Sequence, residues 1–298
     1  MKPAPFEYVA VSSVAEAVRT LASNEGAKVI AGGQSLMPLL SLRLARPTLL
    51  VDINGLGLDG FTVDAVDSSV RVGALFRHRR LELDPRVSRS APLLAAAAPL
   101  IGYPAIRNRG TIGGSLAHAD PVAELPAVLV ALSGSVLVIG SGGERSVSAL
   151  ELFEGFLTTS LAPEEIIVEV CLPPLAARGE RHGAAFCEWA LRSGDFAEAG
   201  VGVGVAIDGS GTCVALGAGA CGIASTPMPL SEVVAEAGVV GANGATDVTD
   251  VLLRSVASRV ARACAGAPGD RAELAGLLAA RAVNRAFNQA RIEEASAA

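Results

Sequence analysis

The sequence lacks the features that membrane-spanning and nucleic-acid-binding proteins need. Its longest apolar runs, such as Val128 to Leu132, are far shorter than the roughly 20 residues of a membrane-spanning helix. Only Lys2 and Lys28 are lysines, and the net charge is −6, whereas nucleic-acid binding depends on clustered positive charge. Neither a membrane nor a nucleic acid is therefore an expected partner. The first ten residues lack the pattern of a signal peptide, which favours a cytoplasmic location.

Cysteine and histidine are scarce and widely spaced. The five cysteines form no C-x-x-C pair, and the three histidines show no metal-ligand spacing. The usual patterns of zinc and iron–sulfur ligation are therefore absent, and we expect no metal site in this chain. An odd, scattered set of cysteines is typical of buried free thiols rather than of a catalytic thiol. The cysteines are Cys171, Cys187, Cys213, Cys221 and Cys264.

Motifs of hydrolytic and nucleotide-hydrolysing enzymes are also missing. The chain contains no G-x-S-x-G, H-E-x-x-H or Walker A sequence. Glu164 and Glu165 form a carboxylate pair, but they follow Pro163 directly before an expected strand, which indicates a solvated turn. We therefore predict no catalytic acid, base or nucleophile in this chain.

Apolar periodicity and turn residues predict an α+β protein of two domains. Ser13 to Glu16 has the spacing of a helix capping box. A strand at 28–31, a helix at 35–44 and a strand at 48–53 complete a β–α–β unit that ends near residue 58. Later strands are expected at 61–64, 69–74, 135–139, 166–172, 183–192, 200–207 and 212–219, and helices at 91–99, 121–132, 247–264 and 271–292. A linker over 173–181 separates domain 1–176, with subdomains of about 1–58 and 59–176, from domain 177–298.

The first candidate ligand site is the first glycine loop, Ala31 to Ser35. Here a strand meets two glycines and the start of a helix. Glycines allow the main chain to approach a ligand closely, and successive N–H groups can bind a pyrophosphate. The alternative is an ordinary tight turn between a strand and a helix.

The second candidate is the second glycine segment, Asn108 to Pro121. Gly113 and Gly114 again permit close approach of the main chain, and Thr111 and Ser115 can donate to phosphate oxygens. Asp120 before Pro121 is either a ligand group or a helix N-cap, and Glu124 is either a partner for sugar hydroxyls or a solvated carboxylate. Two such segments suit a dinucleotide better than a single phosphate.

Neither segment has the G-x-G-x-x-G spacing of a Rossmann site. The stretch Gly200 to Val205 resembles that spacing superficially. Its strict alternation of glycine and valine instead predicts a strand with one bare face for close packing.

Two long motifs resemble a known family. AGGQSLMPLLSLRLARPTLLVDI (Ala31 to Ile53) and IRNRGTIGGSLAHADPVAE (Ile106 to Glu124) are similar to the FAD-binding, or medium, subunits of carbon monoxide dehydrogenase and xanthine dehydrogenase-type molybdenum hydroxylases. Gly73 to His78 and Arg192 to Ala197 fit the same family, and the resemblance extends from about residue 3 to 205. It implies the bipartite FAD-binding fold of vanillyl-alcohol oxidase, with two α/β subdomains. It also implies a C-terminal α+β domain like that of the carbon monoxide dehydrogenase flavoprotein.

The resemblance also implies which residues bind the cofactor. The first glycine loop and residues 111–115 would enclose the pyrophosphate and ribityl chain of FAD, and the carboxylates would bind its hydroxyls. Isoleucines would line the isoalloxazine or adenine, and the segment after residue 191 would approach the flavin ring. The expected cofactor-binding residues are Ala31, Gly32, Gly33, Gln34, Ser35, Leu36, Ile101, Ile106, Thr111, Gly113, Gly114, Ser115, Ala117, His118, Asp120, Glu124, Ile167, Arg192, Asp195 and Phe196. His78 and His182 are expected to be structural or on the surface.

One departure from the family concerns charge near the flavin. Xanthine dehydrogenases place a lysine at the pyrimidine end of the ring, where reduction builds negative charge. The corresponding stretch here, Phe186 to Trp189, has none. Arg192, main-chain N–H groups or a helix terminus would have to stabilise that charge instead.

The family implies electron transfer within a larger enzyme. A large subunit with the molybdenum cofactor would oxidise the substrate, and a small subunit with two 2Fe–2S clusters would pass electrons to the FAD of this chain. The flavin would then reduce an external acceptor, in a heterohexamer built as a dimer of heterotrimers. Two alternatives remain: a self-sufficient FAD-dependent oxidase or reductase, and a non-catalytic assembly protein with the same fold.

Overall fold

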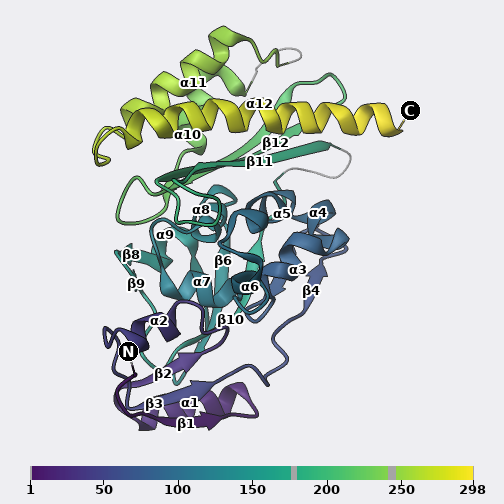
Figure 1. Ribbon diagram of the computed structural model, residues 1–298. Coiled ribbons are helices and arrows are strands. Elements are labelled where there is room, and N and C mark those ends of the chain that lie inside the picture. The colour runs from purple at the N-terminus through teal and green to yellow at the C-terminus, as the bar shows by residue number, and fades with distance from the viewer. Residues whose placement is uncertain (1, 176–179, 241–245, 298) are drawn as a thin grey trace.

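The computed structural model describes residues 2–175, 180–240 and 246–297, and side chains as far as residue 292. Its first part is a small parallel sheet with strand order β1-β3-β2, covered by a helix (Figure 1). The predicted β–α–β unit is confirmed. Its elements are β1 (Glu7–Ala10), α1 (Val14–Ser23), β2 (Ala27–Ile30), α2 (Leu36–Ser41) and β3 (Leu49–Asp52).

Both helices of this unit differ from the prediction in detail. Ser13 caps α1 by accepting from the N–H of Glu16 at 3.2 Å, but the carboxylate of Glu16 accepts from Ser12 rather than Ser13, so only half of the predicted capping box forms. Helix α2 ends at Ser41, before the predicted residue 44. Arg43 lies in the left-handed region at φ 60°, which cannot continue a helix.

The second part is a five-stranded antiparallel sheet with strand order β4-β5-β10-β6-β7. Its strands are β4 (Phe61–Val63), β5 (Val70–Gly73), β6 (Ser135–Gly140), β7 (Gly143–Ser148) and β10 (Ile166–Leu172). The main segments beside it are α3 (His78–Leu83), α4 (Pro85–Ser90), α5 (Pro92–Ala97), η1 (Ala98–Leu100), α6 (Pro104–Arg107), α7 (Ile112–His118), α8 (Glu124–Ala131), α9 (Ala149–Leu152), β8 (Phe153–Gly155) and β9 (Thr158–Thr159). The helix predicted over 91–99 is a short α-helix followed by the 3₁₀ turn η1, because Pro99 has no N–H to extend it.

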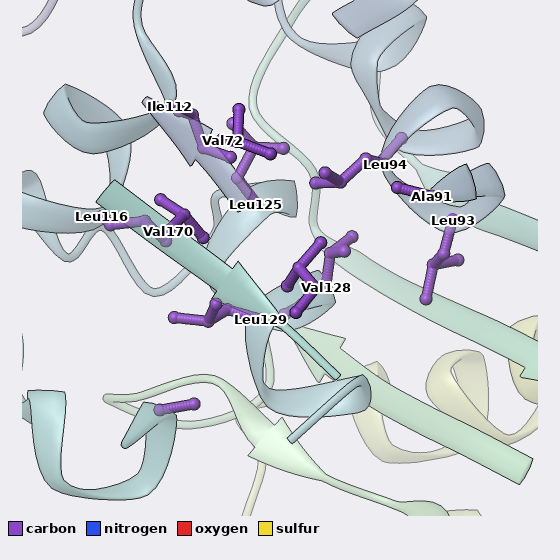
Figure 2. Close-up of a cluster of buried hydrophobic side chains, with 14 of the residues drawn as sticks. Val72, Ala91, Leu93, Leu94, Ile112, Leu116, Leu125, Val128, Leu129 and Val170 are labelled. Carbon is purple, nitrogen blue, oxygen red and sulfur yellow. The ribbon is translucent and has the colours of Figure 1, made fainter. Parts of the chain in front are cut away.

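The core of this part joins α7 and α8 to the sheet. Ile112 and Leu116 of α7 lie beside Leu125 of α8 and Val170 of β10, and all four are at most 1% exposed (Figure 2). Burying one side chain of this size stabilises the fold by about 1.5–3 kcal/mol. Helix α7 is therefore fixed in orientation by its apolar side.

The turn at Glu164 and Glu165, which was predicted to be solvated, contains a carboxylate with protein partners. The carboxylate of Glu165 is bound by Arg145 at 2.7 Å and by the N–H of Ala162 at 2.8 Å, and its side chain is 12% exposed. Arg145 holds the pKa of this carboxyl below its ordinary value. Arg145 and Glu165 thus form a structural ion pair.

The third part is a four-stranded antiparallel sheet covered on one face by two long helices (Figure 1). Its elements are β11 (Arg181–Trp189), β12 (Ala199–Ile207), β13 (Cys213–Cys221), β14 (Met228–Pro229), α10 (Ser231–Val234), the π-helical turn η2 (Ala235–Val239), α11 (Asp250–Ala263) and α12 (Arg271–Ala297). The predicted strands and helices are present within a few residues. Of the predicted linker 173–181, residues 176–179 lie outside the described residues, and β11 already begins at Arg181. No described helix combines the length and apolar character needed to cross a membrane.

The alternating stretch in β12 has a bare face, as predicted. Val201, Val203 and Val205 lie in the core with α11 and α12, while Gly202 on the opposite face contacts the ring of Phe186. On the adjacent strand, a Cβ atom at Gly219 would overlap the carbonyl oxygen of Ala127 in α8. The main chain of the third sheet therefore lies directly on α8.

We predict that Gly219→Ala destabilises the protein, because the added methyl group has no room against the main chain of α8. Overpacking of this kind costs about 1–3 kcal/mol, so the melting temperature should fall by several degrees. Gly209→Ala is the matched control, since a Cβ there meets no atom within 4 Å. Equal melting temperatures for the two variants would contradict close packing of the third sheet on α8.

Candidate functional site

The two glycine segments meet through their main chains. A Cβ atom on Gly32 would overlap the carbonyl oxygen of Arg109 and lie 2.9 Å from Cα of Gly110. Arg77 donates to the same carbonyl of Arg109 and, at 2.7 Å, to the side-chain oxygen of Asn54. Asn54 in turn donates to the carbonyl of Ala31 at 2.8 Å. A closed network of contacts therefore holds both segments in one place.

The first glycine loop presents free main-chain donors. Gly32 is buried, whereas Gly33 is half-buried with φ 71°, a conformation that favours glycine. The side chain of Gln34 donates to the carbonyl of Gly32 at 3.1 Å. Among the described residues no acceptor is found for the main-chain N–H groups of residues 33–36. This loop has the unused donors that binding of an anionic group requires.

The second glycine segment is not a loop throughout, because α7 begins within it. Thr111 is the N-cap, and its hydroxyl oxygen accepts from the N–H of Gly114 at 3.1 Å. The N–H of Gly113 donates to the carbonyl of Ala74 at 2.9 Å. A Cβ on Gly113 would also lie 2.6 Å from that of Ala74. Gly113 is therefore needed for packing, and these N–H groups already have acceptors.

The outer side of α7 carries most of the predicted ligand residues of this segment. Gly114 and Ala117 are exposed, and Ser115 and His118 are half-buried. A Cβ on Gly114 would approach only the hydroxyl of Thr111, at 2.8 Å. Since the opposite side of the helix is anchored in the core (Figure 2), this face is open to a ligand.

Asp120 and Glu124, the acidic residues after α7, have neither of the alternative roles considered above, which were a helix N-cap and a solvated carboxylate. Asp120 is not the N-cap of α8, which begins at Glu124; its carboxylate accepts from the N–H of Val122 at 3.1 Å in a local turn. Glu124 is not a solvated carboxylate, because it is 8% exposed. Burial, together with the charges of Glu188 and Asp120, raises the pKa of Glu124 to about 8.

The histidines have separate environments. His78 is 5% exposed, so it is structural rather than on the surface, and burial lowers its pKa to about 4. Its ring lies directly behind the second glycine segment, 2.7 Å from the position of a Cβ on Gly110. His118 is half-buried at the end of α7, and burial lowers its pKa. Of these two histidines, His118 is the one that a ligand on the outer side of α7 could contact.

The predicted isoleucines occupy two environments. Ile101 and Ile106 are half-buried in the segment that Arg107 fixes by donating to the carbonyls of Ile101 and Gly102, at 3.2 and 2.7 Å. The Arg107 guanidinium also pairs with Glu82 at 2.9 Å, with both side chains largely buried. Ile167 is 4% exposed and belongs to the core. Its side chain is thus covered by protein, unlike those of the other two isoleucines.

The predicted segment near the flavin ring lies between β11 and β12. Arg192, Asp195 and Phe196 are placed on the outside of the molecule, and Phe196 is 76% exposed. A Cβ on Gly194 would lie 2.8 Å from the ring of Tyr103. This segment of the third sheet therefore contacts the region that carries Ile101 and Ile106.

Three residues of this region were not identified from the sequence. Asn54 and Arg77 connect the glycine segments, and Glu188 of β11 acts electrostatically on Glu124. Asn54 and Arg77 each follow a predicted strand, at the end where loops meet ligands, which was the available signal. No sequence signal pointed to Glu188, because strand spacing alone does not show which distant charges act on one another.

The cysteines agree with the predicted free thiols. All five are free; four are buried and Cys171 is half-buried. Burial raises the pKa of Cys213 and of Cys264 to about 11. No group of potential metal ligands is found within the described part of the chain.

Comparison with known proteins identifies the family. Residues 4–175 match the FAD binding domain in molybdopterin dehydrogenase. The 6-hydroxypseudooxynicotine dehydrogenase complex subunit alpha of Paenarthrobacter nicotinovorans is 47% identical over 72% of this chain and 71% of its own length. The carbon monoxide dehydrogenase medium chain of Afipia carboxidovorans is 32% identical over 98% of this chain and 100% of its own. A chain of Hydrogenophaga pseudoflava carbon monoxide dehydrogenase superposes with a TM-score of 0.87 and 34% identity, over 97% of this chain and 99% of that one.

The fold and the matches define a flavoprotein component of a multi-subunit oxidoreductase. The chain belongs to the family of FAD-binding medium subunits of molybdenum hydroxylases. The predicted α+β fold class is confirmed by the structural match. The geometry also suits FAD, since the first glycine loop has free N–H donors, Gly114 is open, and no described side chain binds the buried carboxylate of Glu124.

We predict that Arg107→Met lowers stability by about 1–3 kcal/mol, because it frees two carbonyls and leaves Glu82 with only the more exposed Arg79, at 2.7 Å. The control is Arg259→Met, since the Arg259–Glu236 pair is 40% and 69% exposed and such pairs contribute about 0–1 kcal/mol. Chemical denaturation of both variants measures the difference. Similar losses would show that the Arg107 pair is no more important than a surface contact.

Proposed function

We propose that this chain holds one FAD across its two glycine segments. The free N–H groups of residues 33–36 would bind the pyrophosphate, since those of the second segment already have acceptors. Ser35 is exposed and Ser115 is half-buried, so each glycine segment offers a hydroxyl, and the open face of Gly114 leaves room for the ligand. This difference between the segments is the observation that carries the proposal.

The remaining predicted residues have complementary roles in the proposal. Asp120 and Glu124 would accept hydrogen bonds from sugar or ribityl hydroxyls, which would give the buried carboxylate of Glu124 a side-on partner that no described side chain supplies. Ile101 and Ile106 would cover a ring. Ile167 can contribute only through its main chain.

The loop between β11 and β12 would approach the isoalloxazine. Arg192 is its one guanidinium and is exposed, so it can stabilise negative charge near the pyrimidine end. Asp195 and Phe196 would shape the same side. FAD, when bound, supplies the electron-transfer chemistry, while these side chains orient it and limit access of water.

The chain would act as an electron relay within a complex. A small 2Fe–2S subunit would donate electrons, a large molybdopterin subunit would oxidise the substrate, and the assembly would be a cytoplasmic dimer of heterotrimers. Within the chain, residues 1–176 would form the FAD-binding domain and 177–298 the C-terminal domain. The free thiols suit a reducing compartment.

The decisive experiment is to purify the chain alone and together with its partner subunits. The expected result is yellow protein with about one FAD per chain and no substrate oxidation by the isolated chain. Turnover by the isolated chain would instead indicate a self-sufficient oxidase. Absence of flavin from both preparations, even after FAD is added, would refute the proposal.

We predict that Gly114→Val weakens FAD binding roughly tenfold or more, a change of at least about 1.4 kcal/mol, because the side chain fills the open face of α7. The melting temperature of the flavin-free protein should fall by only a few degrees, since the hydroxyl of Thr111 must shift and its N-cap hydrogen bond is weakened. Gly142→Val, at an exposed turn with no atom within 4 Å, is the control for binding. Gly113→Ala should instead lower stability, because its Cβ would contact the main chain of Ala74.

A further inference from the structure

A cavity of about 230 Å³ lies where α4 and α5 meet the third sheet. Its walls come from these two helices, the end of β10, the residue after α8 and strands β11 and β12. Helix α5 packs on β11 beside it (Figure 1). No described residue that lines the cavity belongs to the expected cofactor-binding set. The cavity is therefore a different feature from the proposed FAD site, and it lies between the FAD-binding part and the third sheet.

The floor of the cavity is apolar and buried. Leu93 of α5 and Leu172 of β10 are at most 2% exposed, and β12 contributes Gly204. A Cβ on Gly204 would lie 3.2 Å from Cδ2 of Leu175 and 4.0 Å from that of Leu132. Glycine at this position of the bare face of β12 therefore leaves a space that a larger residue would fill.

The mouth of the cavity is polar. Arg89 and Ser90 at the end of α4 are exposed, and His182 of β11 is half-buried. In the part of the chain that the structure describes, the side chains of Arg89 and His182 make no hydrogen bond or ion pair. None of the described residues that line the cavity is an aspartate or glutamate. An anion at the mouth would therefore meet an unpaired guanidinium and an imidazole, with no acidic group against it.

Volume and polarity together define the kind of ligand that fits. An apolar cavity of roughly 150 Å³ holds a benzene ring, so the larger space here suits one ring or a short branched chain with a small polar head. The buried leucines favour an apolar body, because binding would remove their surfaces from water. A single guanidinium at the mouth matches the charge and shape of one carboxylate.

We infer that this cavity binds a small amphipathic monocarboxylate, with its apolar body over Gly204 and its carboxylate at Arg89 and His182. The inference does not depend on the proposed FAD site. Such a ligand contacts α5 and β12 at once, so it binds the arrangement in which the FAD-binding part and the third sheet are docked. By mass action it stabilises that arrangement.

The test titrates benzoate and its neutral counterpart benzamide into the full chain at constant pH, while NMR signals of the histidine rings are recorded. Benzoate should shift the ring signals of His182 in a saturable way and leave those of His118, at the end of α7, unchanged. Benzamide should bind about tenfold more weakly, because it lacks the charge-assisted hydrogen bond to Arg89. Saturating benzoate should also raise the melting temperature.

Three variants separate the charge at the mouth from the space at the floor. Arg89→Gln changes an exposed residue, so the fold should be retained, and its affinity for benzoate should fall about tenfold while that for benzamide stays the same. Arg86→Gln is the matched control, since Arg86 lies on the same helix but outside the cavity lining; it should bind benzoate as the unchanged protein does. Gly204→Leu fills the space from β12 and should abolish binding of both compounds.

Several results would overturn the inference. Equal affinities for benzoate and benzamide, or equal benzoate affinities of Arg89→Gln and Arg86→Gln, would show that no carboxylate is recognised at the mouth. Binding that persists in folded Gly204→Leu, or the absence of a saturable shift at His182, would show that the cavity is not the site. The same titration of the assembled complex by calorimetry should give the same affinity. Loss of binding there would mean that a partner subunit covers the cavity instead.

Discussion

The site depends on direct contact between main chains. At Gly32 the first glycine loop lies on the carbonyl of Arg109, and any larger residue would force the two segments apart. Such contact fixes positions more firmly than side-chain packing does, because a peptide group has no rotamers with which to relax. Gly219 on α8 and Gly183 on the carbonyl of Ala286 in α12 repeat the arrangement. The glycines thus join all three sheets into one frame around the ligand-facing surface.

Two buried carboxyl groups, those of Glu82 and Glu124, differ in whether a cationic side chain neutralises them. Arg107 and Glu82 neutralise one another, and Arg107 also binds two carbonyls, so the charges serve the fold. Glu124 has no such partner among the described side chains, although it is buried to a similar extent. Leaving a buried carboxylate unsatisfied costs stability unless a proton or a ligand compensates. The contrast separates a structural ion pair from the buried carboxylate to which the proposed FAD site gives a binding role.

Much of the fold and part of the site could be predicted from the sequence. Alternation and periodicity located the strands and helices, and the bare face at Gly200 to Val205 followed from its pattern alone. The two glycine motifs identified the family. What could not be predicted were interactions set by tertiary packing, such as the start of α7 inside the second glycine segment and the burial of Glu124. Likewise, nothing in a strand pattern shows that the charge of Glu188 would act on Glu124, about sixty residues earlier in the chain.

The third sheet contributes residues to the proposed FAD site. The match to the FAD-binding domain ends at residue 175, yet the loop with Arg192, which the proposed function places near the flavin ring, comes after that residue. A ligand that contacts both parts binds more tightly when they are docked, and by linkage it stabilises their docking to the same extent. In the proposed FAD site, residues that pack the third sheet on α8, such as Gly219, would influence cofactor retention without touching the cofactor. The packing of the third sheet on α8 would then itself be a determinant of that site.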